Sequence, residues 1–226
     1  MAKVNTKLVS WEDIVNWTHG LALKIKESGW TPDVVVSIAR GGYVPARLLC
    51  DFLDIHDLLS VQVLHWGRAA EITAEAHVKY PIPVSLEGKK VLLVDDICDT
   101  GDSIIVARKH LEEKAKPAEI RVAVMQWISS VAKIKPDYYV DEVKDWVWYQ
   151  YPWTRMEDTM NFLEKIMSER AKEGKKEWSF EELVEGFKEW YGIDVGERYY
   201  KLALERLIEL GKIAYRDGKY ILGEQV

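Results

Sequence analysis

The chain has 226 residues, of which 48% are hydrophobic and 30% charged, and its net charge at pH 7 is −6. This size and apolar content suffice for one ordinary domain plus a small second one. The negative charge argues against nonspecific nucleic-acid binding, which depends on basic contacts to phosphates. The sequence contains no apolar run that could span a bilayer and no signal-peptide pattern, and Cys50 and Cys98 lack metal-ligand spacing. We therefore expect a cytoplasmic protein with reduced thiols.

Helical and strand patterns alternate up to about residue 150. Ser10 and Asp13 form a capping-box pattern at the start of the first helix. Residues 67–84 have no clear period and contain two prolines, which indicates a long loop or hairpin able to move over a site. Such alternation predicts an α/β fold with a parallel sheet flanked by helices. The predicted elements are a helix at 10–26, a strand at 34–39, a helix at 43–53, and strands at 59–66, 91–96 and 120–127.

The most informative segment is VLLVDDICDTGDS, residues 91–103. Its first four residues are aliphatic, as in a strand covered on both faces, and Asp95 and Asp96 follow where that strand should leave the sheet. Residues 99–103 then form a small polar turn that opens a helix, with Gly101 permitting unusual backbone angles. Amide groups at such a turn can bind a phosphate, and paired carboxylates can bind a cation or hydroxyl groups. Together they indicate a site for a ribose 5-phosphate.

A second turn of the same kind follows the strand at 34–39. The segment IARGGYVPA, residues 38–46, places Arg40, Gly41 and Gly42 between a strand and a helix. Because parallel strands end at the same edge of a sheet, these amides and the guanidinium should lie near the acidic turn.

Residues 91–103 resemble the phosphoribosyl pyrophosphate (PRPP) motif of the type I phosphoribosyltransferases, position by position. The resemblance implies that Asp95 and Asp96 bind the ribose hydroxyls and help to place Mg²⁺, together with PRPP and water. It also implies that Asp99 accepts a proton from the purine N7, and that residues 40–42 hold the diphosphate, with a peptide that can be cis in relatives. The residues expected at the 5′-phosphate are Asp99, Thr100, Gly101, Asp102 and Ser103.

The segment 133–153 resembles the base-binding region of hypoxanthine, guanine and xanthine phosphoribosyltransferases, with a Lys-Pro-Asp step, two aromatic-rich strands and a Pro-Trp end. A lysine ammonium only donates hydrogen bonds, so it selects a purine with oxygen at C6 over adenine. Lys135 is the first choice for this role and Lys133 the alternative. Trp148 is expected to stack on the purine, with Trp146 as a competitor, and the Tyr149 backbone to read the purine edge.

The chain departs from this family pattern after Pro-Trp, where relatives often carry an acid that helps to place magnesium. Here the residue is Thr154, and Glu157 or Asp158 are the acids that could compensate. Otherwise the ion is held only by PRPP, water and the pair Asp95–Asp96.

Residues 155–226 show a different pattern, with three amphipathic helices and a hairpin turning at Asp217-Gly218, which resembles a winged-helix module. This stretch holds 13 basic and 16 acidic residues, a net charge of −3. Its third helix, where basic residues alternate with acids, is a poor reader of a DNA groove. We expect the module to serve oligomerisation, as a homodimer or homotetramer, or to cap the site. The domains predicted are therefore 1–154, a transferase, and 155–226, a winged-helix-like extension.

Two functions agree with these residues. The first is a purine-salvage phosphoribosyltransferase that joins a 6-oxopurine base to PRPP with Mg²⁺. The second is a PRPP-sensing regulator that keeps the fold without turnover and binds nucleic acid. Asp99, Lys135 and the aromatic segment favour the enzyme, because a PRPP sensor needs no purine pocket. Within the enzyme class, an orotate, uracil or adenine transferase fits less well, and the preference among guanine, hypoxanthine and xanthine stays open.

Overall fold

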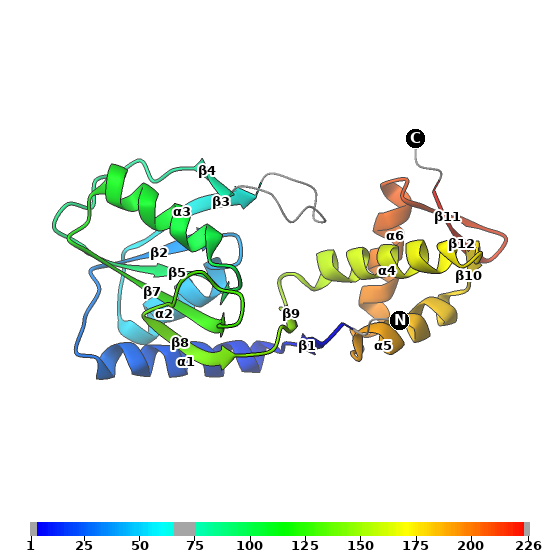
Figure 1. Ribbon diagram of the computed structural model, residues 1–226, viewed down its shortest axis with the longest axis horizontal. Coiled ribbons are helices and arrows are strands. Elements are labelled where there is room, and N and C mark those ends of the chain that lie inside the picture. The colour runs from blue at the N-terminus through cyan, green and yellow to red at the C-terminus, as the bar shows by residue number, and fades with distance from the viewer. Residues whose placement is uncertain (1–3, 66–75, 224–226) are drawn as a thin grey trace. The chain divides into compact units, whose positions relative to one another are not determined.

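The computed structural model describes residues 4–65 and 76–223 (Figure 1). The chain forms two compact units. The sheet unit comprises Glu12–Trp146, and the helical unit comprises Met1–Trp11 together with Val147–Val226. This division falls eight residues before the boundary expected after residue 154, because the strand β9 (Trp148–Gln150) pairs in parallel with β1 (Thr6–Leu8).

The sheet unit is built around a mainly parallel sheet in the order β4-β3-β2-β5-β7, with β6 and β8 also paired to β7. Every pairing is parallel except that of β4, which runs antiparallel to β3. The strands are β2 (Val34–Ala39), β3 (Leu58–His65), β4 (Ala76–Tyr80), β5 (Lys90–Val94), β6 (Ile97–Cys98), β7 (Glu119–Ile128) and β8 (Tyr138–Val143).

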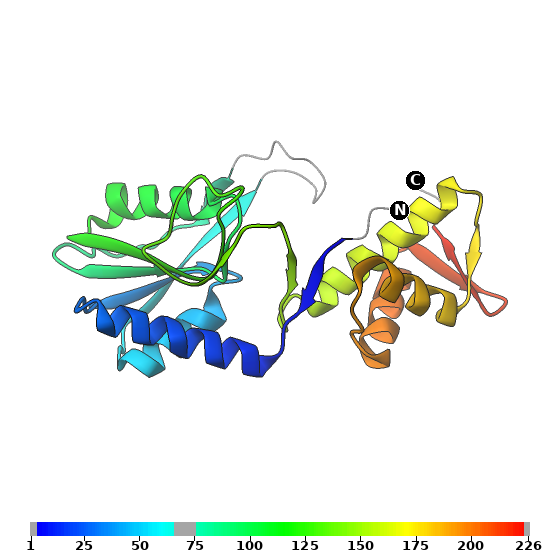
Figure 2. The ribbon, with the colours of Figure 1, turned by 60° about the horizontal axis from the view of Figure 1, so that its bottom comes forward.

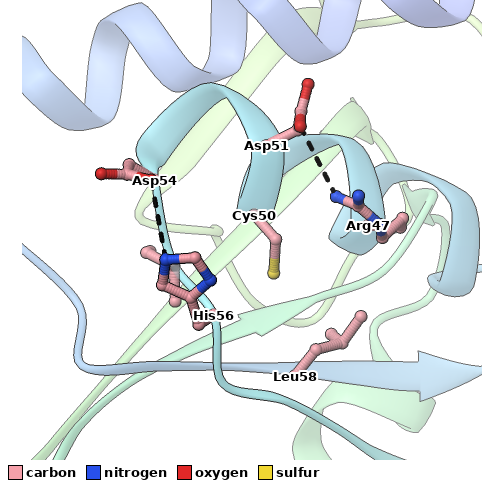
Figure 3. A pocket seen from close by; sticks show the side chains of 7 residues that line it. Arg47, Cys50, Asp51, Asp54, His56 and Leu58 are labelled. Atoms are coloured by element: carbon pink, nitrogen blue, oxygen red, sulfur yellow. Dashed lines mark ion pairs between the residues drawn. The ribbon is translucent and has the colours of Figure 1, made fainter.

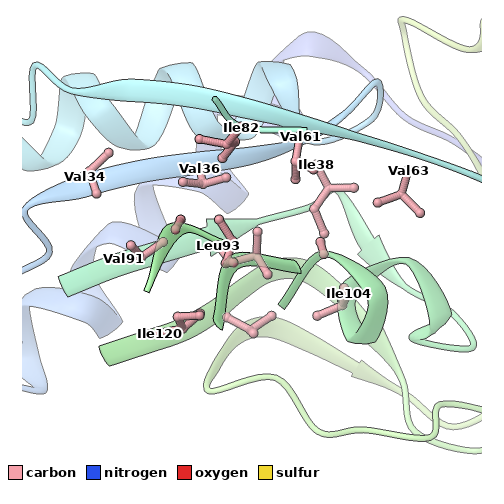
Figure 4. Close-up of a cluster of buried hydrophobic side chains, with 14 of the residues drawn as sticks. Val34, Val36, Ile38, Val61, Val63, Ile82, Val91, Leu93, Ile104 and Ile120 are labelled. Carbon is pink, nitrogen blue, oxygen red and sulfur yellow. The ribbon is translucent and has the colours of Figure 1, made fainter. Parts of the chain in front are cut away.

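Helices cover both faces of this sheet, so β2 is buried along its whole length and β5 is buried apart from its first residue, Lys90. α1 (Trp11–Glu27) and α2 (Tyr43–Leu53) lie on one face and bury Val35 and Leu92. On the other face α3 (Asp102–His110) continues into a π-helical turn, and a second cluster gathers around Leu93 (Figure 4). These two clusters confirm the predicted α/β architecture.

The predicted strands and helices of this unit are confirmed, with ends shifted by a few residues. The segment 67–84 is in part a hairpin, because β4 returns antiparallel along β3 with a register shift at Gln62/Val63. The prediction that residues 67–84 move over a site stays a prediction, and residues 66–75 lie outside the described residues. Both cysteines are free and buried.

The helical unit contains the three predicted helices and a three-stranded antiparallel sheet in the order β10-β12-β11 (Figure 2). Ser179 caps the second helix in a complete capping box with Glu182, and the hairpin turns at Asp217 and Gly218, both with positive φ. The order of elements is that of a winged-helix-like module. They are α4 (Arg155–Lys172), β10 (Glu177–Trp178), α5 (Phe180–Tyr191), α6 (Glu197–Glu209), β11 (Ile213–Arg216) and β12 (Lys219–Leu222). Within the described part of the chain, no helix is both long and apolar enough to cross a membrane.

Truncating a buried side chain of the central strand β5 should destabilise the sheet unit. Leu93 is 0% exposed and packs in the cluster of Figure 4. Leu93→Ala should therefore lower the free energy of unfolding by about 2–5 kcal/mol, through lost burial and the cavity left behind. Denaturant unfolding measures this. The control Leu23→Ala, on a side chain that is 45% exposed, should change stability far less, and an equal loss in both variants would contradict the assignment of the core.

Candidate active site

The candidate site lies where the chain reverses its direction of travel across the sheet. From β2 the chain crosses to β3 on one side, whereas β5, on the other side of β2, leads on to β7 and β8. The loops after β2 and β5 therefore leave the carboxyl ends of neighbouring parallel strands in opposite directions. Such a switch point opens a crevice in which α/β proteins bind ligands.

The two loops touch directly through glycine. A Cβ atom at Gly41 would lie 2.3 Å from Asp96 Oδ2, and one at Gly42 would lie 2.4 Å from the Val94 carbonyl oxygen. A side chain at Gly41 would displace the Asp96 carboxylate, and one at Gly42 would push against the backbone of the neighbouring loop. The peptide between Ala39 and Arg40 is cis, as the resemblance allows. The predicted diphosphate loop and the predicted acidic pair are thus brought together.

The acidic pair follows β5 as predicted, but its two members differ in environment. Asp95 is only 9% exposed, and its Oδ1 accepts a hydrogen bond from the Asp96 amide at 3.0 Å. Asp96 Oδ1 in turn accepts from the Ile97 amide at 2.9 Å. Burial, and then the adjacent Asp96 charge, raise the pKa of Asp95 well above its usual value. Asp95 therefore carries an ionisation cost that a bound cation or donor would relieve.

The next turn carries the features expected of a phosphate loop. Gly101 has a φ of +86°, and α3 begins at the following residue, so the amides of its first turn have no partner within the helix. Burial raises the pKa of the Asp99 carboxyl, which suits a group that must accept a proton. Burial and the charges of Asp95 and Asp99 raise the pKa of Cys98 to about 12, so this thiol stays protonated at neutral pH.

The segment Lys133–Lys135 is fastened to the phosphate loop. The Lys133 amide donates to the Thr100 carbonyl oxygen at 2.8 Å, and a Cβ at Gly101 would lie 2.9 Å from Ile134. The Lys133 ammonium pairs with Asp102 at 2.7 Å. The sequence pattern missed this ion pair, because its members are 31 residues apart.

Lys135, the first choice for reading the base, has a different neighbourhood. Its ammonium lies 5.4 Å from the ring centroid of Trp127 and 5.7 Å from that of Tyr139. The side chain is exposed, and such cation–π contacts hold a cation without using its hydrogen-bond donors. Lys135 thus keeps donors for a ligand, whereas the alternative Lys133 is engaged by a carboxylate.

Trp148 and Tyr149 belong to the helical unit, whereas the loops after β2 and β5 belong to the sheet unit. Trp148 is 36% exposed and meets the Phe162 ring edge-on at 5.5 Å. Its amide donates to Asn5, and Gln150 accepts from Val9, so the main-chain groups of β9 that face β1 are those of Trp148 and Gln150. By strand alternation the amide and carbonyl of Tyr149 face the other side. This orientation agrees with a role for the Tyr149 backbone in reading a ligand edge.

The remaining candidates are placed as follows. Trp146, the competitor of Trp148, belongs to the sheet unit and is 42% exposed. Thr154 donates through its hydroxyl to the Asp158 carboxylate at 2.6 Å, and Asp158 is 6% exposed. Asp158 is therefore occupied within the first turn of α4, which weakens its case as a metal ligand.

The acidic pair fits a magnesium ion that takes its other ligands from substrate and water. Carboxylate oxygens are the donors that Mg²⁺ prefers, and one or two of them per site is usual. Across residues 4–65 and 76–223 no group of three or more His, Cys, Asp or Glu side chains could hold a metal by itself. Asp95 and Asp96 are the residues that would hold such an ion, together with substrate and water.

A cavity of about 340 Å³ at the end of α2 is separate from this site (Figure 3). Its lining includes Leu58, the first residue of β3, so it lies at the amino end of that strand and not at the carboxyl ends where the loops meet. Arg47 lies 3.9 Å from Asp51, and His56 lies 3.8 Å from Asp54. We assign it no part in the chemistry above.

A parallel sheet with a glycine turn after β2 and an acidic Asp-Thr-Gly loop after β5 defines the type I phosphoribosyltransferase fold. The chain belongs to the phosphoribosyl transferase domain family, whose profile matches residues 6–153. The fold and enzyme class expected from the sequence are thereby confirmed. The residues after 153 lie outside this match.

Individual relatives agree with the family. The chain is 26% identical over 151 residues to a xanthine-guanine phosphoribosyltransferase of Nitratidesulfovibrio vulgaris, covering 64% of this chain and 82% of the relative. It is 30% identical over 153 residues to the enzyme of that name from Cereibacter sphaeroides, covering 64% and 84%. A solved purine phosphoribosyltransferase from Pyrococcus horikoshii is similar with a TM-score of 0.56 at 29% identity, over 66% of this chain and 93% of that one.

The buried Asp95 carboxyl should cost stability. A carboxyl with a raised pKa in the folded state favours the protonated form, so its contribution becomes unfavourable as the pH rises from about 4, the usual carboxyl value. Asp95→Asn should therefore raise the melting temperature of the ligand-free protein at pH 8 while lowering turnover. Calorimetry between pH 4 and 8 should show the gain shrinking toward low pH. A melting temperature that falls in the variant at pH 8 would refute this assignment.

A side chain at Gly41 should disrupt the contact with Asp96. Gly41→Ala places a methyl group 2.3 Å from Asp96 Oδ2, so the Asp96 carboxylate must move. We expect diphosphate release to fall by about 10²-fold or more, as small misplacements at reacting centres do. The control is Gly20→Ala in α1, where an added Cβ would meet no atom within 4 Å. This variant should keep normal turnover, and its helix should be more stable. Equal turnover in both variants would show that Gly41 is not part of the site.

Proposed function

We propose that this protein is a purine-salvage phosphoribosyltransferase that converts a 6-oxopurine base and PRPP into the nucleoside 5′-monophosphate and diphosphate. The observation that carries the proposal is the meeting of three groups at the β2/β5 switch point. These are the glycine turn after Arg40, the acidic pair, and the loop that opens α3. Amides for two anionic groups and carboxylates for a diol match the parts of PRPP in one crevice.

In this proposal the groups of the site divide the tasks as follows. Residues 99–103 bind the 5′-phosphate, residues 40–42 bind the diphosphate, and Asp95 and Asp96 bind the ribose hydroxyls. Asp95 and Asp96, with substrate and water, would hold a magnesium ion, which would neutralise charge on the departing diphosphate. The carboxylates stabilise positive charge on the ribose ring, and Asp99, with its raised pKa, accepts the proton from the purine N7.

The choice of a 6-oxopurine is supported by Lys135 and by the activities for which the relatives are named. An ammonium at Lys135 donates to an oxygen at C6 and cannot accept from an amino group. Trp148 stacks on the base and the Tyr149 backbone reads its edge, an assignment carried by chain order and by the orientation of β9. The relatives from N. vulgaris and C. sphaeroides are named for xanthine and guanine, which places these bases among the first to be tried.

The extension, residues 155–226, serves in this proposal to assemble a homodimer or homotetramer or to cap the site in a cytoplasmic enzyme. Two of the three basic residues of α6 support this over nucleic-acid binding, because each lies beside a glutamate of the same helix. Lys201 pairs with Glu197 at 2.5 Å, and Arg206 pairs with Glu209 at 2.7 Å. Cations paired in this way offer little to phosphates.

Diphosphate release in the presence of PRPP and Mg²⁺ should distinguish an enzyme from a regulator. We expect turnover with guanine, hypoxanthine or xanthine, and none of comparable rate with adenine, uracil or orotate. Asp99→Asn, which removes the proton acceptor, should lower kcat by about 10²-fold or more. Because the pKa of Asp99 is raised, wild-type kcat should fall as the pH drops through that pKa, and the variant should lose this limb.

The matched control is Asp54→Asn, an exposed acid with the left-handed backbone that asparagine tolerates, and its turnover should stay normal. Binding of PRPP without turnover on any base would overturn the enzyme proposal and favour the regulator.

A further inference from the structure

An acidic side chain lies in the loop that must bind the 5′-phosphate. Asp102 is the first residue of α3, and its Oδ1 lies 2.7 Å from the Lys133 ammonium. Its Oδ2 accepts a hydrogen bond from the Thr100 hydroxyl at 3.0 Å. One carboxylate thus engages a hydroxyl and a cation that a phosphate in this loop would use, and two anions cannot share them without repulsion.

Lys133 is tied to this loop by its main chain. Its amide donates to the Thr100 carbonyl oxygen at 2.8 Å, and the next residue, Ile134, packs against Gly101. The side chain itself is 61% exposed, against 30% for Asp102. The ammonium is therefore held beside the loop by its backbone, while its tip can turn toward a ligand that arrives from solvent.

We propose that Lys133 is a further ligand of the 5′-phosphate, and that Asp102 is an internal counter-ion that occupies Lys133 and Thr100 until the phosphate displaces it. The inference rests on the proposed function, because it assumes that a phosphate binds this loop. A phosphate carries close to two negative charges and three strong acceptor oxygens, so it is a stronger partner for an ammonium than one carboxylate.

The exchange makes the site selective for a phosphorylated sugar. A ribose without its 5′-phosphate has no anion that could replace Asp102 as the partner of Lys133. The ion pair of Asp102 with Lys133 therefore stays intact when such a sugar is present. The affinity for a phosphate is lowered by the free energy needed to displace Asp102. The two ends of this ion pair therefore have opposite effects: Lys133 strengthens phosphate binding and Asp102 weakens it.

Calorimetric titration with inorganic phosphate tests these opposite signs without requiring turnover. Lys133→Ala should weaken phosphate binding by about tenfold or more, since a charged hydrogen bond is lost. Asp102→Asn should tighten it several-fold, and Lys133→Arg should keep most of the wild-type affinity. In turnover assays KM for PRPP should rise in Lys133→Ala and fall in Asp102→Asn. The control is Lys109→Ala on α3, which breaks an exposed ion pair with Glu113 in the π-helical turn that follows. It should leave the phosphate affinity and KM for PRPP unchanged.

Two results would overturn the inference. If Lys133→Ala and Asp102→Asn both weaken phosphate binding, the pair only stabilises the loop. If Lys133→Ala leaves the phosphate affinity unchanged in a variant whose melting temperature shows it to be folded, Lys133 is not a ligand. Absence of turnover on every purine base, with the opposite effects on phosphate binding intact, would uphold this inference and overturn the proposed function.

Discussion

The close approach of the loops after β2 and β5 is the contact on which the site depends. Parallel pairing of Ser37 with Val94 brings the carboxyl ends of the two strands together, and the missing side chain of Gly41 leaves room for the Asp96 carboxylate. Burial of both sheet faces fixes this register, because a slip of one residue would exchange the clusters under α1, α2 and α3. The packing of the core therefore sets the geometry of the loops.

The same arrangement stores an electrostatic cost where the chemistry takes place. Asp95, Asp96 and Asp99 lie within five residues at the end of a buried strand, and the pKa values of Asp95 and Asp99 are both raised by burial. Ligands that carry a cation or hydrogen-bond donors relieve this cost, so binding and folding are linked. In the loop of residues 99–103, Asp102 and Lys133 neutralise each other's charge at a distance of 2.7 Å.

The parts of the fold that depend on local sequence were predictable. The aliphatic run before Asp95 and the Asp217-Gly218 turn each carry their own signal, and the structure confirms them. Three features depend on pairing between distant residues and could not be predicted. These are the partnership of Thr6 with Trp148, which moves the unit boundary, the two-residue strand β10, and the ion pair of Asp102 with Lys133. Periodicity reports which face of an element is buried, but not which distant segment covers it.

The most direct test of the central claim is a crystal structure of the protein with Mg²⁺ and PRPP. The account predicts the 5′-phosphate on the amides of residues 99–103, the diphosphate beside residues 40–42, and the ribose hydroxyls at Asp95 and Asp96. It would be contradicted by PRPP bound elsewhere, for example in the cavity beside Arg47 and His56, with the switch-point loops unchanged.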